Sequence, residues 1–165
     1  MTTRFLRNKV VEVSPRSDDS IAVSWRQTDD LLKATVNITV QLPDLEIVEA
    51  AAELSRLVPP AWSKAGELIK KIEGVRVGGG LRKIAQGLLG GPNGCPVLVD
   101  AVLESANAII LHFTRPVLQA LESLEGDEML ADLKAMVKNN PRLVRSCVAF
   151  QDDSIIMQGL NSEDG

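Results

Sequence analysis

The clearest pattern in the chain is an alternation of apolar and polar side chains, with almost no errors, within residues 31–42, LLKATVNITVQL. The apolar members are Leu32, Ala34, Val36, Ile38, Val40 and Leu42, and the residues between them are polar. Successive side chains of a β-strand point to opposite faces of a sheet, so a period of two predicts a half-buried strand here.

Two segments with the same period precede this strand. Residues 20–28, SIAVSWRQT, alternate large apolar side chains with small or polar ones, and residues 4–13 provide a partner strand. The segment between them, SPRSDDS at 14–20, has the composition of a turn. Because short connections cannot return a chain to a parallel neighbour, these strands are expected to form an antiparallel meander.

Residues 45–57, LEIVEAAAELSRL, carry two conflicting signals. Leu45 and Ile47 continue the alternation, whereas EAAAELSRL has high helix propensity. We predict a fourth strand that ends in helical or irregular structure before Pro59, and leave strand or helix open for residues 48–57.

From Trp62 onward the apolar period becomes helical. Residues 63–74, SKAGELIKKIEG, predict a helix with Ser63 as N-cap and Gly74 just past its end. A short helix follows at 81–89, and an amphipathic one at 127–141, DEMLADLKAMVKNNP.

The segment between these two helices, residues 96–126, is apolar on most sides and predicts the long helix around which the other elements pack. Pro96 suits its first turn, with Asn93 or Gly94 as the cap, and Gly126 suits its end. Pro116 is expected to kink or split it, because proline removes a helical hydrogen bond.

These patterns together predict an α+β fold. An N-terminal antiparallel sheet of three to four strands packs against a C-terminal layer of helices that includes one long apolar helix. We expect a single domain over 1–165, with mainly strands at 1–58, mainly helices at 59–150 and a tail at 151–165.

Composition restricts the partners. The formal net charge is −4 and the isoelectric point is near 5.1, so we expect no nucleic-acid partner. The uncharged run at 105–114 is far shorter than the ~20 residues of a membrane helix, and residues 1–13 lack the apolar segment of a secretory signal. We therefore expect a cytoplasmic protein without a membrane partner. Cys95 and Cys147 are too few for a disulfide framework and are expected to be thiols.

Glycines are concentrated in residues 77–96, VGGGLRKIAQGLLGGPNGCP. The segment satisfies neither the dinucleotide fingerprint G-x-G-x-x-G after a strand nor the P-loop pattern G-x-x-x-x-G-K-[ST]. Two interpretations stay open: the glycines allow tight helix connections, which we favour, or free N–H groups at helix N-termini bind a small acidic ligand. The candidate ligand-binding residues are Gly78, Gly79, Gly80, Arg82, Gly91, Gly94 and Cys95.

Candidate catalytic groups are few, because His112 is the only histidine. If one helix joins Cys95 to His112, the two lie roughly 25 Å apart and form no dyad. Cys95 is therefore a candidate nucleophile only as a thiolate stabilised by the helix N-terminus behind Pro96. The sequence has neither C-x-x-C nor H-E-x-x-H spacing, so we expect no metal site and no cofactor.

Several segments resemble an uncharacterised bacterial family, domain of unknown function 2889. They are the strand order, ATVNITVQLPDLEIVEAAAEL, IEGVRVGGGLRKIAQGLLGGPNGC and the apolar helix after it. The family's turn typically reads Gly-Gly-x-x-Gly-Cys-Thr-His, which Gly90, Gly91, Gly94 and Cys95 match, whereas Pro96 and Val97 replace the last two residues. The later SCVAFQDDS resembles a cysteine-containing segment of the family, which places Cys147 there. The resemblance implies the fold rather than a mechanism, because the family's function is unassigned.

Two classes of function follow. We favour a noncatalytic binding or assembly module with a site for a small acidic ligand near the glycine-rich turn; the alternative is a thiol-dependent enzyme, or a subunit accessory to one, that uses Cys95. We also expect a homodimer, because the long helix has more apolar side chains than one stripe buries in a small domain. They are Val97, Leu98, Val99, Val102, Leu103, Ile109, Ile110 and Leu111.

Overall fold

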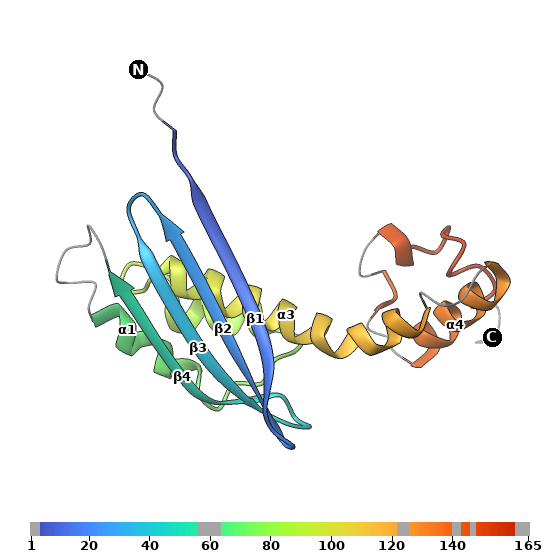
Figure 1. Cartoon of the computed structure of the whole chain (residues 1–165), viewed down its shortest axis with the longest axis horizontal. Coiled ribbons are helices and arrows are strands. Elements are labelled where there is room, and N and C mark those ends of the chain that lie inside the picture. The colour runs from blue at the N-terminus through green and yellow to red at the C-terminus, as the bar shows by residue number, and fades with distance from the viewer. Residues whose placement is uncertain (1–3, 56–63, 122–125, 140–142, 146–147, 161–165) are drawn as a thin grey trace. The chain divides into compact units, whose positions relative to one another are not determined.

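The computed structural model describes residues 4–55, 64–121, 126–139, 143–145 and 148–160 (Figure 1). The chain divides into two compact units, Met1–Phe113 and Thr114–Gly165, and each is described by itself. The elements in chain order are β1 (Arg7–Ser17), β2 (Ser20–Asp29), β3 (Lys33–Gln41), β4 (Glu46–Ser55), α1 (Ala65–Leu68), the 3-10 helix η2 (Ile69–Ile72), α2 (Leu81–Leu89), α3 (Pro96–Leu121), α4 (Gly126–Asn139) and the 3-10 helix η4 (Val148–Phe150).

The first unit has an α+β fold, as the sequence predicted. Its four strands form one antiparallel sheet in the order β1-β2-β3-β4, so every strand pairs with its neighbour in the chain. The apolar residues that predicted β3 are the buried ones. Ala34, Val36 and Ile38 lie on the buried face, and Lys33, Thr35 and Asn37 lie on the other. The meander is therefore confirmed.

The first hairpin is tighter than predicted. The expected turn at 14–20 is mostly strand, because β1 continues to Ser17 and pairs there with Ser20. A register shift between Pro15 and Ser17 accommodates the proline, which cannot donate a hydrogen bond to the ladder.

Residues 48–55, for which helix and strand both remained open, belong to β4. Pairing with β3 overrides the helix propensity of the alanines, because Ala50 is buried opposite Ile38 in the core. A register shift beside Val40 places Ile47 and Ala50 on the same buried face. Residues 56 and 57 lie outside the described residues.

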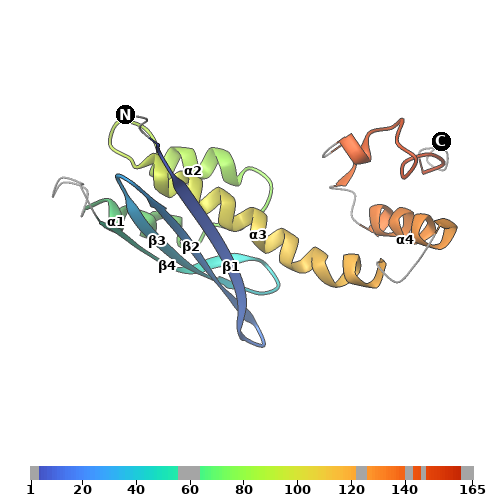
Figure 2. The same ribbon diagram turned by 45° about the horizontal axis from the view of Figure 1, so that its top comes forward.

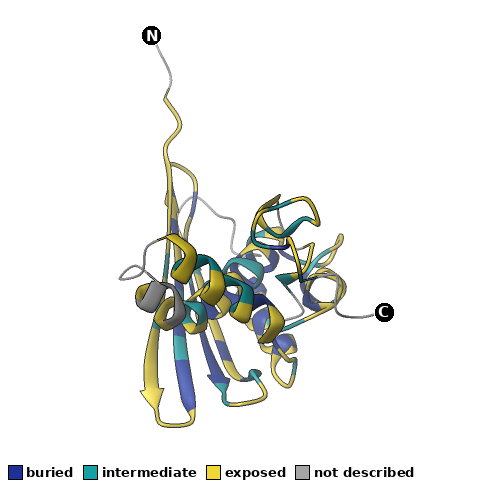
Figure 3. Ribbon diagram, turned by 90° about the vertical axis from the view of Figure 1, so that its right-hand side faces the viewer, coloured by how far each residue is buried: buried dark blue, intermediate teal, exposed yellow. Residues whose placement is uncertain are grey.

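The helices of the first unit lie on one side of the sheet (Figures 1 and 2). The side of α3 that packs into the core recurs every three or four residues, as expected for a helix against a sheet. Its buried members are Leu98, Val99, Ala101, Val102, Ser105, Ala106 and Ile109. Ile69 and Ile72 of η2 and Leu81, Ala85 and Leu89 of α2 belong to the same core. Figure 3 shows buried segments on both strands and helices.

The helix predicted at 63–74 is shorter and partly 3-10. Its α-helical turns cover only Ala65–Leu68, its N-cap is Lys64 without a side-chain cap bond, and Ser63 lies outside the described residues. A Cβ on Gly66 would lie 2.7 Å from the carbonyl oxygen of Ala52. Glycine therefore lets α1 pack directly against the backbone of β4. Gly74 has a φ of 84°, in agreement with its expected place after this helix.

The first half of the outer edge of β4 is occupied by other groups of the same chain. The N–H of Ile47 donates to the carbonyl of Val75 (2.9 Å), and the N–H of Gly74 donates to the carbonyl of Ile47 (2.8 Å). Further along the edge, the N–H of Ala50 donates to the Glu73 carboxylate (3.0 Å). These bonds satisfy backbone groups that an edge strand otherwise exposes.

Helix α3 is the predicted long apolar helix, with different ends. Pro96 is its first residue as expected, but the carbonyl of Cys95 accepts the first helical bond, so neither Asn93 nor Gly94 is the cap. Pro116 does not split the helix, since removal of a single N–H leaves the flanking turns bonded. Gly126, predicted as the end of this helix, is instead the first residue of α4 with a φ of 59°.

By length and composition alone, Pro96–Pro116 of α3 could also cross a membrane. The core helix of a soluble protein meets the same criterion, and side chains of the first part of α3 pack in the hydrophobic core with the sheet.

The second unit contains α4 and a series of turns. Val137 of α4 and Met157 are its buried apolar side chains among the described residues, at 3% and 1% exposure. Arg145 pairs with Asp152 at 2.7 Å. Cys147 and residues 161–165 of the predicted tail lie outside the described residues.

Candidate functional site

The glycines singled out from the sequence form two separate turns. Gly78, Gly79 and Gly80 precede α2, whereas Gly91 and Gly94 follow it. Because α2 has nine residues, the two turns are separated by roughly 13 Å along the helix axis. The structure therefore does not bring the predicted ligand-binding residues together in one loop.

Each turn uses glycine for a different reason. Gly80 and Gly91 have φ values of 84° and 77°, in the left-handed region that favours glycine. Gly94 has no such φ, but a Cβ there would overlap the carbonyl oxygens of Leu89 and Gly90. Gly78 and Gly79 have neither a positive φ nor a neighbouring atom within 4 Å of the place a Cβ would take, so other residues fit there sterically.

The two side chains predicted to supply chemistry here differ in exposure. Arg82 is exposed on the first turn of α2. Cys95 is 3% exposed and packs in the hydrophobic core, and its N–H donates to the carbonyl of Leu89 at 2.6 Å. In this position the Cys95 thiol is a core side chain, which favours a structural role.

His112 is separated from Cys95 by the uninterrupted helix α3, so the two form no catalytic pair. The His112 ring is half-buried and packs edge-on against Phe113, with ring centroids 5.4 Å apart. Among the residues that the structure describes, no group of three or more histidine, cysteine or acidic side chains is placed to hold a metal ion.

Asp29 is the most strongly perturbed carboxylate in the described chain. The N–H groups of Leu31 and Leu32 donate to its Oδ1 at 2.9 and 2.7 Å, and Arg7 and Gln27 donate to its Oδ2 at 2.8 and 2.9 Å. Burial raises the pKa of Asp29, but these hydrogen bonds outweigh burial and lower it to about 2. The carboxylate fixes the β2–β3 turn and remains ionised near neutral pH.

A second polar group joins the sheet to α3. The indole N–H of Trp25, which is fully buried, donates to the carboxylate of Glu104, and the Lys9 ammonium lies 2.8 Å from the same carboxylate. Burial raises the pKa of Glu104, while the hydrogen bonds from Lys9 and Trp25 lower it, with a net decrease. The carboxylates of Asp29 and Glu104 are therefore both held by hydrogen bonds and ion pairs within the fold.

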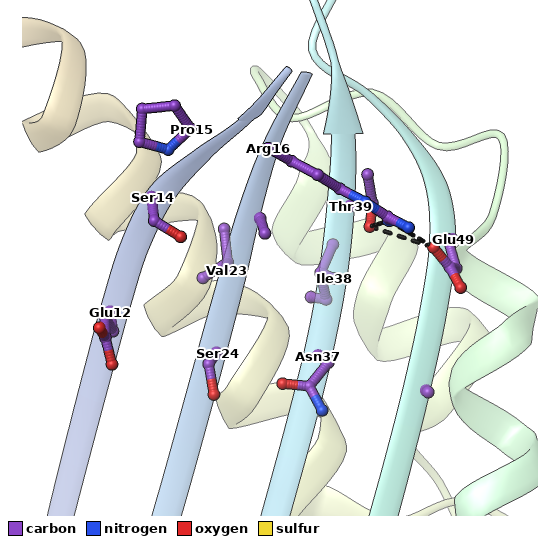
Figure 4. Close-up of a pocket in the computed structure, with 12 residues that line it drawn as sticks. Glu12, Ser14, Pro15, Arg16, Val23, Ser24, Asn37, Ile38, Thr39 and Glu49 are labelled. Carbon is purple, nitrogen blue, oxygen red and sulfur yellow. Dashed lines mark hydrogen bonds and ion pairs between the residues drawn. The ribbon is translucent and has the colours of Figure 1, made fainter.

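The face of the sheet opposite the helices, which we call the open face, is hollowed. The hollow has a volume of about 680 Å³ and spans all four strands (Figure 4). Its lining residues are Glu12, Ser14, Pro15, Arg16, Ala22, Val23, Ser24, Asn37, Ile38, Thr39, Glu49 and Ala51.

Small side chains at matching register positions create this hollow. Ser24 of β2 pairs with Asn37 of β3, which pairs with Ala51 of β4, and Ala22 is on the neighbouring row. Side chains at paired positions lie side by side on one face of a sheet. A row of small residues across three strands therefore leaves the backbone accessible at the centre of the open face.

Charged side chains lie around this centre in opposite-sign pairs. Arg16 Nη1 donates to Thr39 Oγ1 and to Glu49 Oε2, each at 2.6 Å, and so reaches from β1 across to β4 (Figure 4). The hydrogen bond from Arg16, and then its positive charge, lower the pKa of Glu49. Arg26 pairs with Glu12 at 3.2 Å. The open face thus offers hydroxyl and amide groups between neutralised charges.

Sequence reasoning did not identify the open face as a site. The signal was present in the alternation itself, because the polar phase of β2 and β4 contains Ala22, Ser24 and Ala51 where long charged side chains are common. Reading it required the register between strands, which the sequence does not give.

The first unit is a meandering antiparallel sheet covered on one side by helices. Comparison with known families shows which family has this part of the chain. Residues 7–111 match the protein family of unknown function DUF2889, and the chain belongs to that family. The match begins at the first residue of β1 and ends within α3, so it falls inside the first compact unit. Neither the curated proteins nor the solved structures yielded a match to this chain.

Proposed function

We propose that this protein is a noncatalytic binding or assembly module, and that the open face of its sheet is the binding surface. The observation that carries the proposal is the hollow of about 680 Å³ across all four strands. It replaces the glycine-rich turn as the proposed location of binding, since the glycines separate to the two ends of α2.

The chemistry of the open face suits a macromolecular surface. Ser24 and Asn37 provide donors and acceptors at the centre, and the small side chains beside them allow a partner to approach the strands closely. In the pairs Arg16–Glu49 and Arg26–Glu12 each charge keeps a partner of opposite sign when another protein covers it. Binding there leaves the core intact, because the other face of the sheet already packs against the helices.

The burial of Cys95 supports binding over thiol chemistry, because a nucleophilic thiolate must be accessible to its substrate. In a Cys147→Ser background, a mild alkylating reagent at neutral pH is expected to label Cys95 slowly, and quickly only after unfolding. Rapid selective labelling of the folded protein would instead support the thiol-dependent enzyme.

Site-specific photo-cross-linking in the cells that naturally produce the protein tests the binding surface. A photoreactive residue replaces Asn37 on the open face, and a matched variant carries it at Lys71, which is exposed on the helical side. We expect a discrete cross-linked protein species from position 37 and none from position 71. No cross-link from position 37, or the same products from both positions, would contradict the proposal.

A further inference from the structure

We propose that the partner on the open face is a second copy of this chain, so that two sheets pack face to face around a two-fold axis. This inference rests on the proposed function and specifies its partner. Three properties of the open face favour a second copy: its charge balance, its area and the small size of its central side chains.

The charges of the open face are self-complementary. In a two-fold interface the same surface contributes both sides, so a patch with net charge repels its own copy. The whole chain has a formal net charge of −4, but the charges at the hollow balance. The charged lining residues are Arg16, Glu12 and Glu49, and Arg26 pairs with Glu12, which gives two positive and two negative charges.

Both pairs of opposite charge are already formed within one copy, between Arg16 and Glu49 and between Arg26 and Glu12. Figure 4 shows Arg16 reaching toward Thr39 and Glu49 at one end of the hollow, whereas Glu12 lies beside Ser24 at the β1 side of the central row. A second copy can retain these pairs and pack over the neutral centre between them.

The area of the open face reaches what a specific dimer needs. About eight residues along each of four strands cover roughly 26 by 19 Å, on the order of 500 Å² per copy and 1,000 Å² for two. Specific interfaces begin near about 1,000 Å² in total. A second sheet of the same size uses this whole area, whereas a single helix or strand covers only part of it.

Small side chains at the centre permit close packing of the two sheets. Ala22, Ser24 and Ala51 project little from the strands, and Asn37 between them supplies an amide that can both donate and accept across the two-fold axis. Two identical amides can each donate to and accept from the other, whereas two identical groups that only donate or only accept cannot pair. The centre of the open face is therefore suited to its own copy.

Charge substitution at Asn37 tests this arrangement in the full chain. Analytical ultracentrifugation between about 1 and 200 μM measures the self-association of the native protein, Asn37→Arg and Asn37→Glu, with Asn107→Arg on the exposed side of α3 as control. We expect a native dimer, an unchanged control, and self-association weakened by more than about tenfold in both Asn37 variants because like charges meet at the axis. An equimolar mixture of Asn37→Arg and Asn37→Glu is expected to restore the dimer.

Circular dichroism melts establish that each variant is folded before its mass is interpreted. A monomeric native protein over this range would overturn the inference, as would a native dimer that both folded Asn37 variants retain, or a mixture that fails to restore the dimer. If position 37 then cross-links to a different protein in cells, the proposed function stands without the second copy. Cross-linking only to residues 114–165 of the same chain would overturn both.

Discussion

Replacement of Gly94 by alanine tests the geometry of the turn between α2 and α3. The added Cβ would overlap the carbonyl oxygens of Leu89 and Gly90, well inside the 3.0 Å that Cβ atoms in proteins essentially always keep from other heavy atoms. Both neighbours are backbone atoms, so relief requires a backbone shift rather than a new rotamer.

The magnitude follows from what this shift would disturb. The N–H of Gly94 donates to the carbonyl of Gly91 at 3.1 Å, and the N–H of Cys95 donates to Leu89 at 2.6 Å. A net loss of about 1 kcal/mol for each hydrogen bond, with about 1–3 kcal/mol for overpacking, gives a cost of about 3–5 kcal/mol. For a protein of this size, that lowers the melting temperature by at least about 6 °C.

Two further glycines provide the comparison. Gly91→Ala adds no close contact but retains a φ of 77°, so its expected cost is only about 1–2 kcal/mol. Gly79→Ala meets neither obstacle and is expected to change stability by less than about 1 kcal/mol in either direction. The predicted order of melting temperatures is therefore Gly79→Ala, Gly91→Ala and Gly94→Ala, from highest to lowest.

Thermal melts followed by circular dichroism, with and without phosphate-bearing metabolites, measure this order. Equal stability of Gly79→Ala and Gly94→Ala would refute the steric argument. If the glycines have only a structural role, each variant loses the same amount of melting temperature with and without the metabolites. Unchanged melting of Gly91→Ala and Gly94→Ala without metabolite, together with lost protection by it, would instead make this turn an anion-binding site.

Two predictions concern polar groups away from the open face. In the described part of the chain the buried Oγ of Ser105 has no hydrogen-bond partner, so Ser105→Ala is expected to raise the free energy of unfolding by about 1 kcal/mol in urea titrations; a decrease of that size would reveal a bond to the hydroxyl. Because the pKa of Asp29 falls from 3.8 to about 2 on folding, its carboxylate stabilises the fold above about pH 4, and this contribution is lost as the pH falls toward 2. Asp29→Asn is expected to be less stable at pH 7 and less sensitive to acid; parallel acid-unfolding curves for both proteins would contradict this.

The sheet was predictable from the sequence because its main signal is local. A buried strand face needs an apolar side chain at every second residue, and residues 31–42 meet that condition whatever their neighbours are. In β4 the same signal competes with the helix propensity of three alanines, and only the pairing with β3 resolves the competition. The extent of β1 past Pro15 likewise depends on its partner strand, through a register shift that has no sequence signature.

The remaining features depend on contacts between distant residues. Gly66 must be glycine because α1 touches the carbonyl of Ala52 in β4, and no local pattern distinguishes it from the other glycines. The turn glycines were assigned to structure from the sequence, but the constraint on Gly94 comes from neighbouring carbonyls rather than from a positive φ. The hollow of the open face arises from the alignment of three strands. The small residues could be read from the sequence, but the register that brings them together could not.

The covered edge of β4 also limits how copies of this protein can polymerise. An open fibre built by strand addition needs two free edges, since each molecule must receive one neighbour and extend toward another. Here the segment that contains Val75 forms hydrogen bonds with one of the two edges. Because residues 47–50 of β4 are already bonded, a neighbouring strand can pair along a whole edge only at β1, and two molecules joined there present no second full-length edge to a third.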